Sequence, residues 1–114
     1  MQKTPEIRDN ELYHLLREGN VKEFNERRAK GENCDLTGCD FRNLELQGLN
    51  ADDLDLSNCY FRQADLRGID FQKTNLRGAS LHSATISGAY FPAPLKAAEI
   101  RNSVELGTRM RYEE

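Results

Sequence analysis

Three cysteines are the first candidates for chemistry in this chain of 114 residues, because a thiolate can attack an electrophile or bind zinc. They are Cys34, Cys39 and Cys59. No two of them have CxxC spacing, and no nearby histidine completes a zinc site. We therefore interpret all three as small buried hydrophobic residues, and we predict no metal site.

The two histidines, His14 and His82, are the next candidates, as general acids or bases. Neither has an evident serine, cysteine or carboxylate partner in a recognisable motif. The sequence also lacks the G-x-S-x-G, P-loop and G-x-G-x-x-G motifs. We predict a non-enzymatic protein with no catalytic residue and no cofactor.

Composition narrows the classes of partner. The formal net charge is -3, whereas general nucleic-acid binders neutralise phosphates with clustered Lys and Arg. No apolar run approaches the roughly 20 residues that span a bilayer. The segment Met1–Glu6 lacks the apolar region of a secretory signal. We expect a soluble, cytoplasmic protein that contacts neither nucleic acid nor membrane directly.

The elements that position these residues follow from a repeat. Between residues 34 and 91 apolar residues recur every five positions, a period that fits neither a helix nor a strand. A second inward position lies two residues earlier in each unit, because residues two apart in an extended segment share a side. The predicted core consists of the twelve central residues Leu36, Phe41, Leu46, Ala51, Leu56, Phe61, Leu66, Phe71, Leu76, Leu81, Ile86 and Phe91.

The last position of each unit favours a turn. Its turn-forming residues are Gly38, Asn43, Gly48, Asp53, Asn58, Gly68, Gly78 and Gly88. Each unit is therefore predicted to be a short extended piece followed by a corner. A chain that bends every five residues and keeps its apolar side inside must coil into a solenoid.

The units ADLRG at residues 64–68 and TNLRG at residues 74–78 resemble the motif of the pentapeptide-repeat family. The resemblance covers residues 34–93 and implies a right-handed quadrilateral β-helix with four units per coil. Twelve units then give about three coils, in which residues 20 apart stack. It also favours a bacterial source.

The N-terminal residues 1–33 are predicted to form a helical hairpin that covers the first coil. An apolar stripe in the first helix ends at Gly19, and Asn20 with Glu23 fits a capping box for the second helix. Ala51 leaves room in the first coil where the stacked positions carry Phe. We expect Phe24 to fill that room.

Residues 94–114 are predicted to form a C-terminal cap. Pro92 and Pro94 stop the repeat, and Pro94 suits the first position of a helix over about 94–106 that Gly107 ends. We expect this helix to cover the last coil and the tail from Thr108 to be mobile. The hairpin, the repeat and this cap together make one structural domain.

Eight carboxylates in the repeat have two interpretations. In the first, those just before a central residue bond the local backbone at the corners. In the second, they make a negative rod that mimics DNA, since the resemblance extends to family members that bind type II topoisomerases such as gyrase. The acids are Asp35, Asp40, Glu45, Asp52, Asp53, Asp55, Asp65 and Asp70.

Four units per coil would also stack Arg42, Arg62 and His82 as a basic strip. We predict that the protein is a binding or scaffold module for another protein, with this strip as the candidate binding site. The alternative is the DNA mimic described above. The chain is expected to be a monomer or a homodimer that forms through a coil end.

Overall fold

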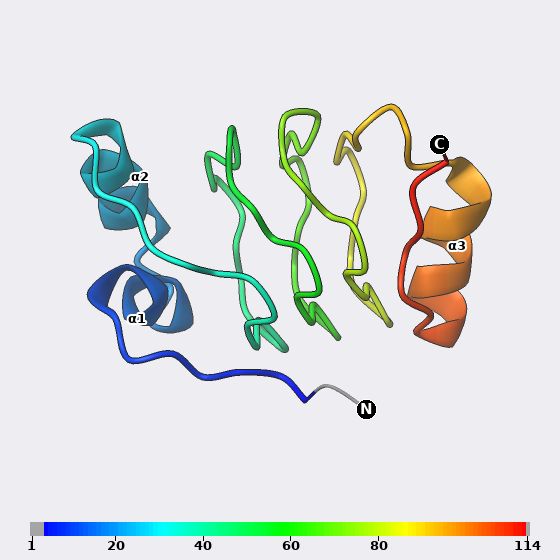
Figure 1. The fold of residues 1–114 in the computed structure, drawn as a ribbon, viewed down its shortest axis with the longest axis horizontal. Helices are drawn as coiled ribbons and strands as arrows, with labels where there is room; N and C mark the ends of the chain where they lie inside the picture. The colour runs from blue at the N-terminus through cyan, green and yellow to red at the C-terminus, as the bar shows by residue number, and fades with distance from the viewer. Residues whose placement is uncertain (1–3, 114) are drawn as a thin grey trace.

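The structure, a computed structural model, describes residues 4–113 as a coiled segment with helices at both ends (Figure 1). The helices in this range are α1 (Glu11–Arg17), α2 (Val21–Ala29) and α3 (Ala97–Leu106). Helices α1 and α2 lie at one end of the coiled segment and α3 lies at the other (Figure 1). The predicted helical caps are therefore confirmed.

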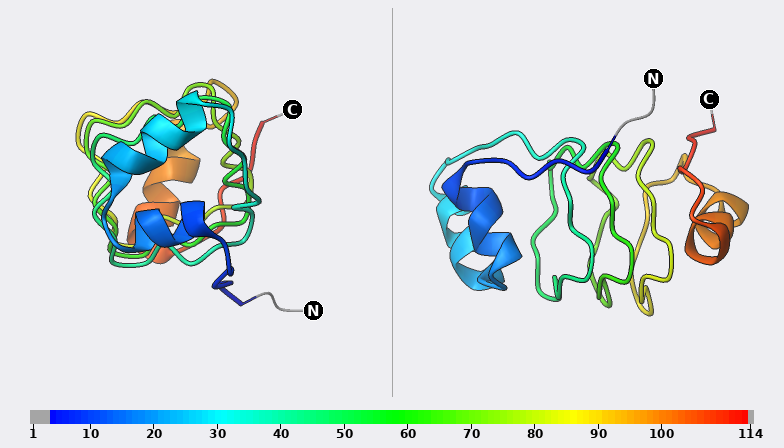
Figure 2. Two further views of the ribbon diagram at one scale, coloured as in Figure 1. Left: turned by 90° about the vertical axis from the view of Figure 1, so that its left-hand side faces the viewer. Right: turned by 90° about the horizontal axis from the view of Figure 1, so that it is seen from below.

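Residues 20 apart in the sequence lie beside each other on neighbouring coils. Parallel bridges join Asp40 to Tyr60 and Tyr60 to Ser80, and the same step recurs in other columns. Twenty residues are four units, and an end-on view shows a four-sided outline (Figure 2, left). Every bridge within residues 4–113 is isolated, because the chain turns a corner before a longer strand can form.

The corners depend on a left-handed backbone at the last position of the unit. The eight predicted turn residues all adopt a positive φ, and Gln63 and Ser83 adopt it as well, at 59° and 60°. This conformation strains residues that carry a Cβ atom, so glycine relieves it and Asn or Asp tolerates it.

Side chains just before the central residue also hold the corners. Asp65 Oδ1 accepts a hydrogen bond from the Arg67 amide at 3.1 Å, and Asp35 Oδ1 accepts one from the Thr37 amide at 2.9 Å. These bonds match the first interpretation of the acids, in which they serve the local backbone. The same bond is made by Asp40, Asn50, Asp55, Asp70 and Asn75.

The core runs through the middle of the coils. Ten of the twelve central residues are buried, and the remaining two, Ile86 and Phe91 in the last coil, are partly buried. Phe41 stacks on Phe61 with ring centroids 5.3 Å apart, as their separation of 20 residues requires. Burying each such side chain contributes about 1.5–3 kcal/mol.

The N-terminal hairpin differs from its prediction at the helix starts. Asn20 precedes α2, but its side chain makes no capping bond, whereas Asn10 accepts one from the Tyr13 amide at the start of α1. Phe24 is fully buried. The neighbouring Asn25 bonds the backbone of Gly48 and Asn50, beside Ala51. A direct contact between Phe24 and Ala51 stays a prediction.

A segment around Glu6 extends the stack by pairing with the first coil. The Glu6 amide donates to the Gly38 carbonyl at 3.0 Å, and the Glu6 carbonyl accepts from the Asp40 amide at 2.9 Å. The Tyr13 hydroxyl donates to the Asp40 carbonyl at 2.7 Å. These contacts satisfy backbone groups that face away from the second coil.

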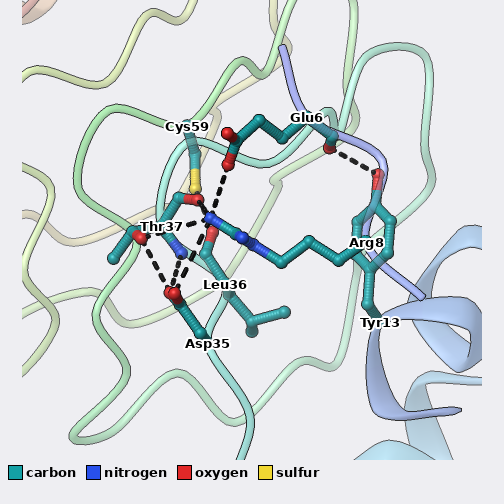
Figure 3. Close-up of polar contacts among 7 residues, drawn as sticks. All are labelled: Glu6, Arg8, Tyr13, Asp35, Leu36, Thr37 and Cys59. Atoms are coloured by element: carbon teal, nitrogen blue, oxygen red, sulfur yellow. Dashed lines mark hydrogen bonds and ion pairs between the residues drawn. The ribbon is translucent and has the colours of Figure 1, made fainter. Parts of the chain in front are cut away.

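Arg8 fastens this segment (Figure 3). Its guanidinium donates to the Thr37 carbonyl and lies 2.6 Å from a Glu6 carboxylate oxygen. The Asp35 carboxylate is 3.7 Å away. Hydrogen bonds from the Thr37 hydroxyl and from the Thr37 backbone amide lower the pKa of Asp35, which keeps it ionised beside Arg8.

The C-terminal cap corrects two predictions. Helix α3 begins at Ala97 rather than at Pro94, because Lys96 is extended and serves as the N-cap residue. Over residues 108–113 the tail packs on the repeat instead of lying free, since Met110 is 1% exposed and pairs with the last coil; Glu114 lies outside the described residues. Its amide donates to the Ala79 carbonyl, and its carbonyl accepts from the Gly78 amide. The predicted end of the helix at Gly107 agrees with its φ of 76°.

A first prediction concerns the core register. Leu66 is 0% exposed, so Leu66→Asp buries a charge without a partner and costs more than about 4 kcal/mol. Arg67→Asp is the control, because that side chain is half exposed and a solvent-exposed ion pair such as the one with Asp65 contributes little to stability. Circular-dichroism melts should show an unfolded Leu66 variant and a folded Arg67 variant. Equal melting temperatures would contradict the register.

A second prediction concerns the corners. Gly68→Ala strains a left-handed residue without meeting any atom within 4 Å, and should cost about 1 kcal/mol. In Gly78→Ala the new Cβ would lie 2.2 Å from Asn58 Oδ1, so the loss should be larger by about 1 kcal/mol. Urea unfolding measures both values. Equal losses would mean that Asn58 moves aside without cost.

Candidate functional site

The structure stacks the backbones of the three residues in the predicted basic strip. The Asn43 amide donates to the Arg62 carbonyl, and the Gln63 amide donates to the His82 carbonyl. Arg42 and Arg62 are exposed, but His82 is half-buried. A Cβ atom on Gly107 would lie 3.2 Å from His82 Cγ, so the histidine sits under the end of α3. His82 is therefore not part of the open surface.

Two arginines outside the repeat join this surface. Arg17 of α1 donates to the Asp40 carbonyl at 3.3 Å and lies 3.8 Å from its carboxylate. Arg109 of the tail lies 4.9 Å above the Tyr60 ring and donates to its hydroxyl and to the Gly78 carbonyl. Sequence reasoning missed both, because nothing in the sequence indicates that two flanks meet on one side of the repeat. We call Arg17, Arg42, Arg62 and Arg109 the arginine face.

The nearly buried carboxylate of Asp40 orients Arg42 within the arginine face. Its carboxylate is bonded by Arg42 Nε at 2.9 Å and by Arg42 Nη2 at 2.9 Å. The hydrogen bonds from Arg42 lower the pKa of Asp40, and Arg17 acts in the same direction. The carboxylate is therefore ionised at neutral pH, and it holds the Arg42 guanidinium in one orientation.

The arginine face opposes the charge of the whole protein. Its four arginines and Asp40 sum to +3, while the chain carries -3, so the remaining residues carry -6. Among residues 4–113, the Arg62 side chain has no hydrogen bond or ion pair. Arg42 uses two of its five N–H donors on Asp40, which leaves donors for a partner.

The carboxylates of the repeat are largely engaged within the protein. Asp65 pairs with Arg67 at 2.8 Å, as Asp40 pairs with Arg42. Asp55 and Asp70 accept from backbone amides two residues further on. These contacts reduce the negative potential that the acids offer to a partner, although side chains without a paired arginine keep their charge.

The cysteines are free and lie inside the stack. Cys59 is 0% exposed, and its thiol donates to the Leu36 carbonyl at 2.9 Å (Figure 3). Burial raises the pKa of Cys34, Cys39 and Cys59, so the nucleophilic thiolate form is disfavoured. His14, on α1, lies 3.8 Å from the Asp9 carboxylate at the surface. Cys39 and Cys59 lie on neighbouring coils, close enough to interact electrostatically, and both are free thiols.

Within the described residues, no helix has the length and apolar character needed to cross a membrane. Comparison with curated proteins and with solved structures found no match. Residues 55–91 match the family model of pentapeptide repeats, in eight copies. The five-residue period and the parallel bridges between residues 20 apart agree with this match, so residues 55–91 are a segment of pentapeptide repeats.

Proposed function

We propose that the protein is a non-enzymatic binding module and that its arginine face holds an acidic segment of another protein. The observation that carries this proposal is the group of four exposed arginines with the nearly buried carboxylate of Asp40 among them. In a chain of net charge -3, such a group favours acidic partners and steers them to one side of the molecule.

Preorganisation supports the proposal. Arg42 is fixed by two bonds to Asp40, and Arg109 is fixed by the Tyr60 ring and hydroxyl. An arginine that is already held loses less side-chain entropy when it binds. Guanidinium groups also bond carboxylates in a planar two-point geometry that lysine cannot reproduce.

The repeat supplies the rigid support for this surface. We propose that residues 34–93 form a right-handed quadrilateral β-helix of three coils and that the protein acts in the cytoplasm. Neighbouring coils are then about 4.8 Å apart, which would set the spacing of Arg42 and Arg62. In an extended acidic chain the carboxylates on one side recur about every 6.8 Å, an interval that the long, flexible side chains of Arg42 and Arg62 can span.

The DNA mimic is the second candidate function. Its support is the charge of -6 that lies outside the arginine face. The ion pairs of Asp40 and Asp65 weaken it, because they neutralise two of the acids that the mimic would use. An effect of the protein on supercoiling by gyrase, measured at low salt where electrostatic attraction is strongest, would favour this candidate.

The test of the arginine face uses an octaglutamate peptide and fluorescence anisotropy at low salt. Arg42→Glu/Arg62→Glu should weaken binding by about tenfold or more, since each reversed charge removes an attraction worth up to about 1 kcal/mol. The control Lys22→Glu/Lys30→Glu makes the same change in net charge on the exposed surface around α2. It should bind nearly as well as the wild type.

An equal loss in both variants would show that only net charge matters, and it would contradict a site on the arginine face. If only the arginine variant loses binding, a pull-down from cytosolic lysate with the same proteins would identify the natural partner. That partner should bind the wild type and the lysine variant, but not the arginine variant. Circular-dichroism melts of both variants would show that the losses do not come from unfolding.

A further inference from the structure

The last coil ends in a row of backbone groups that have no following coil. Over residues 75–83 this row is covered by the C-terminal cap. The Leu76 amide donates to the Tyr112 hydroxyl, and the Leu81 amide donates to Ser103 Oγ, both at 2.8 Å. The Gly78 and Ser83 amides donate to backbone carbonyls of the tail and of α3. Two of the four sides of the coil are thus closed.

The next side, residues 84–88, is open. In the part of the chain that the structure describes, the Ala84 carbonyl and the amides of Ile86 and Gly88 have no hydrogen-bond partner. We call these residues the open edge. Unpaired backbone groups of this kind are a template for another extended segment.

One coil earlier, the equivalent groups show how such a segment would bind. The Ala64 carbonyl accepts from the Thr85 amide at 2.9 Å. The Leu66 amide donates to the Thr85 carbonyl at 2.9 Å, and the Gly68 amide donates to the Ser87 carbonyl at 3.0 Å. The open edge offers the same acceptor and the same two donors, 20 residues further along the chain.

An apolar cleft lies beside the open edge, between the last coil and α3. Its volume is about 390 Å³. Arg101 and Glu105 also line it, and their opposite charges leave it without net charge. The apolar lining consists of Ile86, Ala89, Phe91, Ala97, Ile100 and Val104. The incomplete burial of Ile86 and Phe91 is the consequence of this opening.

We propose that the open edge binds an extended peptide segment of a partner protein as an additional rung, with one apolar side chain in the cleft. The segment runs parallel to residues 84–88. Like the repeat itself, it places a small residue and, two residues later, an apolar residue inward. This site is separate from the arginine face and does not depend on it.

Continuity with the covered part of the row favours this occupant. The extended tail around Met110 already sits on the adjoining stretch, with paired backbone and a buried side chain. The cancelling charges of Arg101 and Glu105 favour an uncharged, apolar side chain over an ionic one. A second copy of the chain fits poorly, because α3 extends beyond the last coil and keeps two coil ends apart (Figures 1 and 2).

The test uses a synthetic peptide with the sequence of residues 62–70, which contains the unit 64–68 that precedes the open edge by one coil. Amide hydrogen exchange of the intact protein is followed by NMR as the peptide is added. Exchange at Ile86 and Gly88 should slow by about tenfold when the peptide is at ten times its Kd. A peptide with Asp in place of Leu66 should have no such effect, because its side chain would bring a charge into the cleft.

Two neighbouring substitutions on α3 locate the site. Ala97→Trp fills the cleft and should abolish the slowing, whereas Ala98→Trp, at an exposed position that does not line this cleft, should leave it unchanged. No slowing at millimolar peptide, or equal effects of the two variants, would overturn the proposal. Self-association of the wild type that only Ala97→Trp prevents would assign the open edge to a second copy and would likewise overturn it.

Discussion

Stacked coils leave a row of unsatisfied backbone N–H and C=O groups at each end, and this constraint accounts for most of what surrounds the repeat. At the first coil, Glu6, Arg8 and Tyr13 supply the missing partners. At the last coil, α3 and the tail supply them along two sides. The flanking segments therefore supply hydrogen-bond partners for the end coils as well as covering the core. Where they stop short, the protein keeps a surface that can accept another chain.

The corners require hydrogen-bond acceptors, and this structural requirement explains why the repeat carries so many acidic side chains. A turn every five residues requires an acceptor for the amide two residues on, and Asp or Asn provides it. The chain therefore acquires many acids for a local structural reason. Arginine two residues after an acid, as at Arg42 and Arg67, then neutralises part of that charge. Because the acids have this local role, the arginines that have no adjacent acid are better indicators of a binding surface.

The fold was largely predictable from the sequence, because the same apolar and turn positions recur in each unit and every recurrence supports the others. Features that occur once were not predictable. The corners at Gln63 and Ser83 followed from their place at the end of a unit, although neither residue type favours a positive φ. The tail was predicted to be mobile because one buried Met110 leaves no periodic pattern. Half of the arginine face was predictable from the sequence. Arg42 and Arg62 occupy equivalent positions of the repeat, whereas Arg17 and Arg109 reach this surface only through tertiary contacts.

The segments around Glu6 and Met110 pair with the same side of the stack, one at each end. This arrangement restricts how the length of the protein can change during evolution. Loss or gain of one five-residue unit would turn the C-terminal cap by a quarter of a coil relative to the N-terminal hairpin, and Arg109 would leave the side that carries Arg17. Loss or gain of 20 residues would keep both on one side and change only the distance between them. Relatives that keep this surface should therefore differ in length by whole coils.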